Sequence, residues 1–500
     1  MATVGLRQYP VSLNPITSTD ASAVAVEDAL FAGLVGLDAG LRWYGDLAEQ
    51  VPTVANGGVR VVGGGMDVRY RLRSGLRWSD GQPLTADDVL FTWQAIMRGS
   101  FGPDAGTAYQ DVERVEKQGD REVVVRFRRT FPAYLQLFGA VLPAHRLAAL
   151  DTRKLAVDPY WQKPDVVSGP FTVKAAVPGD HLSMERNPQF HAGRPRDAVL
   201  DQIVFRALAG QEALAAAARA GELDVALDVG PAALGAAVPP GLRIAEIPSL
   251  GYEQVTLNRQ DPLWSADPRL VEALDAALDR GRRGSRAPAA AGPLAPQVAW
   301  AYEDTLKPQA HDLARSRRLL EQDGWRAGAD GVRQRGGRRL ALTLSTVLGD
   351  PEQEQVGEVV AAEWRAIGAE VAVTSFPARE LFGPEGPLAH GSFQAAAWEW
   401  TLPYDPDSLY DVLHTGGSHN YSRCHDGSID RALDEGRATL ETERRAAAYR
   451  QFQRAYRGAR CELPLYRRPA VAAASRRLHN LALNPAPVGA TWNIGDWWVD

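Results

Sequence analysis

Residues 70–93, YRLRSGLRWSDGQPLTADDVLFTW, contain the signals for a strand, a turn and a helix in succession. The first residues alternate between apolar and charged side chains, which is the pattern of a half-buried β-strand. Asp80 and Gly81 form a typical turn pair. Thr85 precedes an apolar run and is predicted to cap a helix, because two aspartates follow in the first turn, where negative charge is favourable. That helix is predicted to be structural.

A β-rich stretch surrounds this segment, from Trp43 to about Phe131. Further strands are predicted at Val59–Val62 and in the sequence EVVVRFR, residues 122–128. The glycine triplet at 63–65 lies between strands and is predicted to be a hairpin turn, because neither GxxxxGK[ST] nor GxGxxG follows it.

Strands and helices alternate on both sides of the β-rich stretch. At the amino end, an alternating strand and an Asn-Pro turn precede a helical stretch from about Ala21 to Val35. The alternation resumes near Ser168, and another strand–helix series follows Tyr252. The pattern predicts two α/β lobes, with the β-rich stretch inserted in the first.

Length and composition exclude several classes of protein. A chain of 500 residues suggests about three structural units. With 45% hydrophobic and 23% charged residues it is typical of a globular protein. A formal charge of −6 with scattered Lys and Arg argues against nucleic-acid binding. No apolar run approaches the roughly 20 residues of a membrane span, and the amino end lacks the profile of a signal peptide, so we expect any export signal to be missing from this sequence.

Cys424 and Cys461 are the two cysteines of the chain. They are too few for a disulfide scaffold, and their spacing matches no CxxC metal motif. They are therefore either free and buried or joined in one bridge. We expect the bridge if the protein is exported, because an oxidising compartment would preserve it.

The order of several landmarks resembles one family along nearly the whole chain. After residues 70–93 these landmarks are SGPFTV (168–173), ERNPQF (185–190), VTLN (255–258), DPRLVEALDAALDR (267–280), LLEQDGW (319–325), YDP (404–406) and WNIGDWW (492–498). The sequence is similar to the large solute-binding proteins of bacterial ABC importers, which take up oligopeptides, dipeptides, nickel chelates and some oligosaccharides.

This resemblance implies the type II periplasmic-binding-protein fold, an α/β architecture of two hinged lobes that enclose a ligand. Lobe I would combine residues 1–42, 160–250 and 483–500, the inserted β-rich domain 43–159, and lobe II 251–482. The hinge crossings would lie near Leu250–Tyr252 and Leu481–Asn484.

The candidate ligand site is the sequence WEWTLPYDP, residues 398–406. Loops at strand ends are where α/β proteins hold ligands, and aromatic rings offer a large contact area with polar atoms for hydrogen bonds. The alternative from sequence alone is that these rings fill the core. The family places ligand contacts here, which favours a binding role. The candidates are Trp398, Glu399, Trp400, Leu402 and Tyr404.

Leu402 departs from the peptide-binding members, which have at this position an Asp that captures the peptide α-amine. An apolar side chain cannot pair a buried ammonium group, so recognition by that route is doubtful unless Glu399 points inward. Trp400 and Tyr404 instead resemble the nickel-chelate binders, in which a downstream His reaches the metal. His419 lies near that place and is a weak metal candidate, because its loop is polar and lacks HxxxH spacing. We expect neither a bound metal nor a cofactor.

Other wall candidates are weaker, because each residue could equally be packed or capping. They are Ser18, Asp20, Tyr252, Asn258, Tyr302, Tyr421, Thr491 and Trp492.

No enzyme motif is present, neither GxSxG, HExxH nor a Walker loop. Asp405 and Asp407 are interpreted as turn acids. A carbohydrate-active enzyme is the alternative from another class, since tryptophan-rich clefts with carboxylates also bind sugars. A ligand sensor is disfavoured because no DNA-binding segment is attached.

The sequence and the resemblance together predict a solute-binding protein that is not an enzyme. It would capture a peptide or peptide-like solute between two lobes and deliver it to an ABC permease. Nickel-chelate, opine and oligosaccharide binding are the alternatives within the family. We expect a monomer in the periplasm or at the outer face of the cytoplasmic membrane. It would touch the membrane only through the transporter or a removed lipid anchor, and would not bind nucleic acid.

Overall fold

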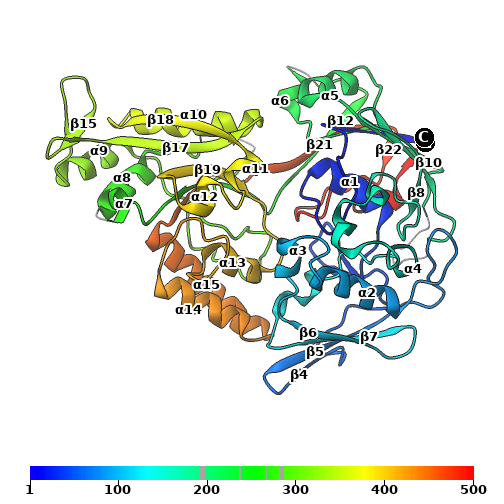
Figure 1. Ribbon diagram of the computed structural model, residues 1–500. Coiled ribbons are helices and arrows are strands. Elements are labelled where there is room, and N and C mark those ends of the chain that lie inside the picture. The colour runs from blue at the N-terminus through cyan, green and yellow to red at the C-terminus, as the bar shows by residue number, and fades with distance from the viewer. Residues whose placement is uncertain (191–197, 236–237, 266, 282–286) are drawn as a thin grey trace. The chain divides into compact units, whose positions relative to one another are not determined.

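The computed structural model describes residues 1–190, 198–235, 238–265, 267–281 and 287–500. The chain divides into two compact units, here called unit 1 (Met1–Ile247 and Ala470–Asp500) and unit 2 (Pro248–Pro469). The chain thus leaves unit 1 once and returns to it once (Figure 1). No helix among the described residues combines the length and apolarity needed to cross a membrane.

Unit 1 contains a seven-stranded mixed sheet in the order β12-β21-β11-β1-β10-β9-β8. The strands are β1 (Ala2–Leu6), β8 (Phe171–Val177), β9 (His181–Arg186), β10 (Gln202–Ala207), β11 (Val225–Leu227), β12 (Leu242–Pro248) and β21 (Pro469–Ser475). The central strand β1 pairs in parallel with β10 and β11 and is almost fully buried. Helix α5 (Gly210–Arg219) contributes Leu214 to a core cluster with Ala226 of β11 and Ala473 of β21.

A separate four-stranded antiparallel sheet, β4-β5-β7-β6, lies in the stretch predicted to be β-rich. Its strands are β4 (Val59–Val62), β5 (Gly65–Arg71), β6 (Val112–Lys117) and β7 (Glu122–Phe127). Helix α2 (Ala86–Met97) begins after Thr85, whose side chain accepts from the backbone N–H of Asp87, while Asp88 accepts from that of Thr85. The backbone N–H of Gly81 donates to the carbonyl of Trp78 at 2.9 Å and closes the predicted turn. The strand up to Arg71, the turn and the helix predicted for residues 70–93 are confirmed. The boundaries 43–159 of an inserted domain stay a prediction.

The remaining elements of unit 1 are short, apart from α1. They are α1 (Ala21–Leu30), α3 (Pro103–Thr107), α4 (Ala144–Leu147), α6 (Pro231–Leu234), the 3₁₀ turns Pro132–Gln136, Thr152–Val157, Pro159–Gln162 and Ile494–Asp496, and the strand pairs β2 (Val35–Leu37) with β3 (Trp43–Gly45) and β22 (Leu478–His479) with β23 (Trp498–Val499).

Unit 2 is built on a five-stranded mixed sheet in the order β18-β17-β19-β13-β20. The strands are β13 (Tyr252–Leu257), β17 (Ala341–Leu348), β18 (Glu370–Pro377), β19 (Ala395–Trp400) and β20 (Glu462–Pro464). Strand β17 runs parallel to β18 and β19, whereas β13 runs antiparallel to β19 and β20. Helices α8 (Pro268–Ala277) and α10 (Pro351–Arg365) supply buried side chains such as Leu274 and Trp364 to the main core of the unit.

The other elements of unit 2 include the helix pair α14 and α15, which pack against each other. The bounds are α7 (Pro262–Ser265), α9 (Leu313–Gln322), α11 (Ala378–Leu381), α12 (Pro387–His390), α13 (Leu409–Leu413), α14 (Gly427–Arg437), α15 (Thr442–Ala459), the 3₁₀ turn Pro406–Ser408, and the small sheet of β14 (Arg326–Ala327), β15 (Arg333–Arg335) and β16 (Arg338–Arg339).

The register of β13 and β19 distributes the candidate residues over two faces of the sheet. Tyr252 pairs with Trp400, and Glu253 pairs with Glu399. Because successive side chains of a strand point to opposite faces, the tyrosine and the tryptophan share one face and the glutamates share the other. We call these the aromatic face and the ionic face.

The return to unit 1 lies earlier than the sequence suggested. The second crossing was expected near Leu481–Asn484, but β21 already pairs with β11 in unit 1, with Ala474 opposite Val225. Residues 470–482, which the prediction assigned to lobe II, therefore belong to unit 1. An alanine-rich strand fits a buried position in either unit, so only the long-range pairing decides where it belongs. The first crossing, expected near Leu250–Tyr252, lies close to the boundary at Pro248.

Candidate functional site

Three aromatic side chains meet where β19 ends. Trp398 is 2% exposed, whereas Trp400 and Tyr421 are half-buried. The rings of Trp400 and Tyr421 are parallel within 5°, with centroids 6.1 Å apart. Trp398 meets both of them edge-on, at 5.6 and 6.0 Å. Trp398 thus fills the core, while Trp400 and Tyr421 form a partly exposed wall.

A buried carboxylate holds Trp400 from within the unit. The indole N–H of Trp400 donates to Glu462 Oε1 at 3.3 Å, and the hydroxyls of Tyr252 and Tyr456 donate to Oε2 at 3.0 and 3.1 Å. Burial raises the pKa of Glu462 to about 7, although these hydrogen bonds oppose the shift. Tyr252 is fully buried, so its role is to support Glu462 and not to form the wall.

Glu399 lies on the ionic face, opposite Trp400. Its Oε2 is 3.7 Å from Nε of Arg468, whose Nε also pairs with Glu253 at 2.6 Å. Nη1 of the same arginine is 3.0 Å from Glu352. Burial raises the pKa of Glu399 to about 7; Arg468 opposes the shift and Glu253 adds to it. The structure therefore directs Glu399 toward Arg468, away from the aromatic wall.

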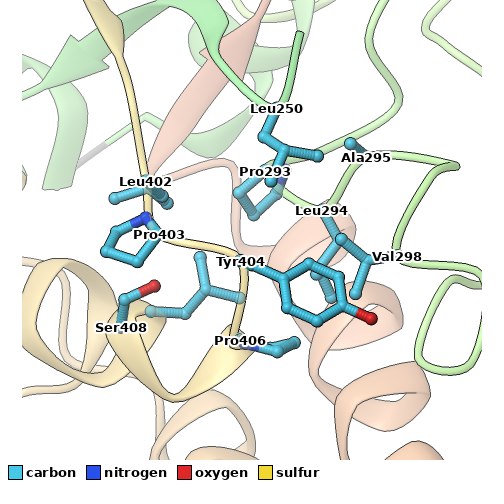
Figure 2. A pocket seen from close by; sticks show the side chains of 11 residues that line it. Leu250, Pro293, Leu294, Ala295, Val298, Leu402, Pro403, Tyr404, Pro406 and Ser408 are labelled. Atoms are coloured by element: carbon cyan, nitrogen blue, oxygen red, sulfur yellow. The ribbon is translucent and has the colours of Figure 1, made fainter. Parts of the chain in front are cut away.

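Leu402 and Tyr404, from the loop that follows β19, line an apolar pocket in unit 2 (Figure 2). The eleven lining residues are Leu250, Pro293, Leu294, Ala295, Val298, Leu402, Pro403, Tyr404, Pro406, Ser408 and Leu409. Burial raises the pKa of Tyr404, and a hydrogen bond with Trp300 opposes the shift. The loop after β19 thus connects the aromatic wall to this pocket.

Two arginines fix this loop. Asp405 pairs with Arg445, with 3.0 Å between Oδ2 and Nη1, and Asp407 pairs with Arg437, with 2.9 Å between Oδ2 and Nη2. Asp405 also accepts from the backbone N–H of Asp407 at 2.9 Å. Both acids therefore act as turn and ion-pair residues.

His419 and the disulfide lie on the loop that carries Tyr421. His419 Nδ1 is 2.5 Å from Asp411 Oδ2, and its ring meets Tyr421 edge-on at 5.8 Å. Cys424 forms a disulfide with Cys461, with 5.7 Å between the Cα atoms. Because Cys461 precedes Glu462, the bridge links the loop of Tyr421 to the strand that supports Trp400. In the described ranges, no group of three or more His, Cys, Asp or Glu could hold a metal ion.

The predicted site residues of unit 1 have structural partners. The hydroxyl of Ser18 donates to Glu27 at 2.5 Å, and Asp20 caps α1 by accepting from its first backbone N–H groups. The hydroxyl of Thr491 donates to the carbonyl of Ala25 at 2.6 Å, and the indole of Trp492 donates to that of Ala482 at 2.7 Å. Each residue thus stabilises its own unit.

Asn258 and Tyr302 do not line the pocket of unit 2. The buried amide of Asn258 donates to the carbonyls of Gly391 and Phe393, both at 2.9 Å, so it fixes a turn. Tyr302 is half-buried.

Sequence reasoning missed Glu462 and Arg467. Arg467 is 3% exposed and donates to several backbone carbonyls, among them those of Leu250 at 3.0 Å and Leu294 at 2.5 Å. The available signal was a charged residue on each side of the apolar run LPLY, residues 463–466, which a packed strand end would explain equally well.

Comparisons with known proteins agree with the resemblance seen in the sequence. The family model described as bacterial extracellular solute-binding proteins, family 5 Middle, matches residues 44–421. The oligopeptide-binding protein AppA of Bacillus subtilis is 25% identical over 462 residues, which cover 90% of this chain and 82% of AppA.

Solved structures match over the whole chain. The structure of B. subtilis AppA in complex with a nonapeptide has a TM-score of 0.81 at 24% identity and covers 100% of this chain and 98% of its own. NikZ from Campylobacter jejuni in complex with Ni(L-His) has a TM-score of 0.82 at 21% identity and covers 99% of each chain. The α/β type II periplasmic-binding fold expected from the sequence is confirmed.

Proposed function

Because the chain belongs to the bacterial extracellular solute-binding proteins of family 5, we propose that it captures a small solute outside the cytoplasm for an ABC importer. The partner would be the permease of that importer, and the protein would act as a monomer without chemical turnover. A peptide or peptide-like solute is the first class, since B. subtilis AppA is named an oligopeptide-binding protein. Opines and oligosaccharides remain alternatives.

This proposal is supported by the loop after β19, which joins the aromatic wall of Trp400 and Tyr421 to the apolar pocket. Trp400 ends β19, and Leu402 and Tyr404 follow it directly into the apolar pocket. Small-molecule sites combine apolar and aromatic surfaces with a few fixed polar groups, and this loop presents such a surface on a rigid strand. The ion pairs of Asp405 and Asp407 hold the loop in place before a solute arrives.

Two steps test the proposal. Mass spectrometry of the solute extracted from protein purified from its own host identifies a ligand, and calorimetry then measures its affinity. Replacing both Trp400 and Tyr404 with Ala should weaken binding by about 100-fold or more, because buried aromatic contacts dominate binding energy.

Trp498→Ala is the matched control, since this tryptophan is 37% exposed and belongs to unit 1. It should bind as tightly as the wild type. Unchanged affinity in a folded double variant would refute the placement of the site. Conversion of the solute into a product would instead refute the binding-protein proposal.

A metal chelate is the second candidate solute, favoured by His419. Its ring nitrogen Nδ1 contacts Asp411, and such a carboxylate orients an imidazole for coordination through its other nitrogen. Titration with nickel–histidine tests this candidate. Binding by the wild type and loss of binding by His419→Ala would support it, and failure of the wild type to bind would remove it.

A further inference from the structure

The pocket beside Leu402 has no charged wall. Among its eleven lining residues, only Tyr404 and Ser408 carry polar side-chain atoms. The empty volume is about 270 Å³. Part of this volume is open to solvent, so the enclosed part is small and has room for a single group of a solute rather than a whole molecule.

The acids nearest to the pocket in sequence cannot supply a negative charge to it. Asp405 follows the lining residue Tyr404, but its carboxylate is paired with Arg445. Asp407 precedes Ser408 and is paired with Arg437. Their side chains are 15% and 4% exposed, so each pair is buried and neutral as a whole.

One cation reaches the pocket walls without such a pair. The guanidinium of Arg467 donates to the backbone carbonyls of three lining residues, Leu250 at 3.0 Å, Pro293 at 3.2 Å and Leu294 at 2.5 Å. In the part of the chain that the structure describes, Arg467 interacts with tyrosines and has no carboxylate partner. Burial lowers its pKa to about 10, so it stays charged at neutral pH.

These charges decide which solute group is favourable. An ammonium group would lose water in the pocket, find no carboxylate among the eleven lining residues, and be repelled by Arg467. An uncharged apolar group would gain from burial at about 25 cal/mol per Å². We propose that this pocket selects an uncharged apolar group of the solute and rejects ammonium groups. This inference rests on the proposed capture of a peptide-like solute and specifies its class.

The test is a competition between two peptide pools. A chymotryptic digest of casein is divided, and one half is acetylated, which converts its ammonium groups into uncharged amides that end in a methyl group. Equal amounts of both halves are mixed with the protein, and the retained peptides are quantified by mass spectrometry. We expect acetylated peptides to be enriched about tenfold, which corresponds to about 1.4 kcal/mol.

Leu402→Asp should abolish or invert this enrichment, because the new carboxylate would pair with an ammonium group. Ser408→Asp places a carboxylate at the same pocket and repeats the test should Leu402→Asp fail to fold. Leu402→Asn has nearly the shape of Leu402→Asp but no charge. It should therefore keep the preference for acetylated peptides. Leu348→Asp is the matched control, because this leucine is 50% exposed and does not line the pocket.

Equal retention of both pools by the wild type, or preference for free amines, would overturn the inference. A preference that survives both Asp variants would overturn it as well, because the pocket would not be its source. Retention of neither pool by the folded wild type would instead overturn the proposed capture of peptide-like solutes, and the inference with it.

Discussion

The two faces of the five-stranded sheet in unit 2 bury their glutamates with different partners. On the aromatic face, Glu462 accepts hydrogen bonds from Tyr252, Tyr456 and Trp400 and, among the described residues, forms no ion pair. On the ionic face, Glu253 pairs with Arg468 at 2.6 Å.

The difference shows how one pair of strands serves two purposes. Neutral hydroxyl donors hold Glu462, which accepts from the indole of Trp400 and so orients it without placing a cation beside the wall that the solute would contact. The guanidinium of Arg468 pairs with the carboxylates of Glu253 and Glu352. The backbone carbonyl of Arg468 accepts from the hydroxyl of Ser249. Arg468 therefore fixes the end of the sheet near both crossings. Buried ion pairs are costly to break, which suits a fixed anchor.

The largest expected effect concerns the disulfide that links the loop of Tyr421 to the residue before β20. Replacing Cys424 and Cys461 with Ser should lower the free energy of unfolding by about 3–4 kcal/mol, because the bridge closes a loop with a sequence separation of 37 residues. Urea unfolding measures the loss. A reductant should destabilise the wild type similarly and leave the double variant unchanged. Equal stability of variant and wild type would contradict this prediction.

The second effect is the pH dependence of the free energy of unfolding that Glu462 confers. Since burial raises its pKa to about 7, the folded protein retains this proton while the unfolded chain releases it near pH 4.5. The folded state then binds more protons, so stability falls as pH rises from about 4.5 to 7, by up to about 3 kcal/mol.

Glu462→Gln should remove this contribution, and the difference between variant and wild type isolates it from Glu399, which shifts in the same direction. Unfolding free energies at pH 5 and pH 8 measure the effect. Parallel pH curves for the two proteins would contradict the prediction.

Replacing one glutamate on each face with Gln compares how much the arginine partner and the tyrosine partners contribute to stability. Glu253→Gln should cost about 2 kcal/mol at pH 7, because Arg468 loses its shortest ion pair in a buried site. Glu462→Gln should cost less than about 1 kcal/mol, because an amide oxygen still accepts from the tyrosines. Urea midpoints at constant slope measure both. Equal losses of stability in the two variants would mean that an arginine partner does not make a buried glutamate costlier to neutralise.

The smallest effect is expected at an exposed ion pair, which serves as the reference for the buried pairs. Arg444→Gln removes an exposed ion pair with Glu441, in which the side chains are 71% and 67% exposed. Its cost should stay below about 0.5 kcal/mol, because water screens the pair. A larger loss in the same urea experiment would show that burial is not what separates the Glu253 pair from surface pairs.

The sequence predicted the local elements well. Thr85 caps its helix as expected, because the cap needs only neighbouring residues. Alternation along β19 implies that Trp398 and Trp400 share a face and that Glu399 has the other. The sequence could not identify Arg468 as the partner of Glu399, because the two residues meet only when distant segments pack.

The sequence by itself determined the α/β class, the family and the stretch that carries the aromatic wall, because these depend on local periodicity, capping and the order of landmarks. Only the tertiary structure decided that the chain returns to unit 1 at Ala470, that Glu462 supports Trp400, and that Arg467 lies against the apolar pocket. Strand pairing and buried charge depend on residues far apart in the chain, and no local pattern encodes their meeting.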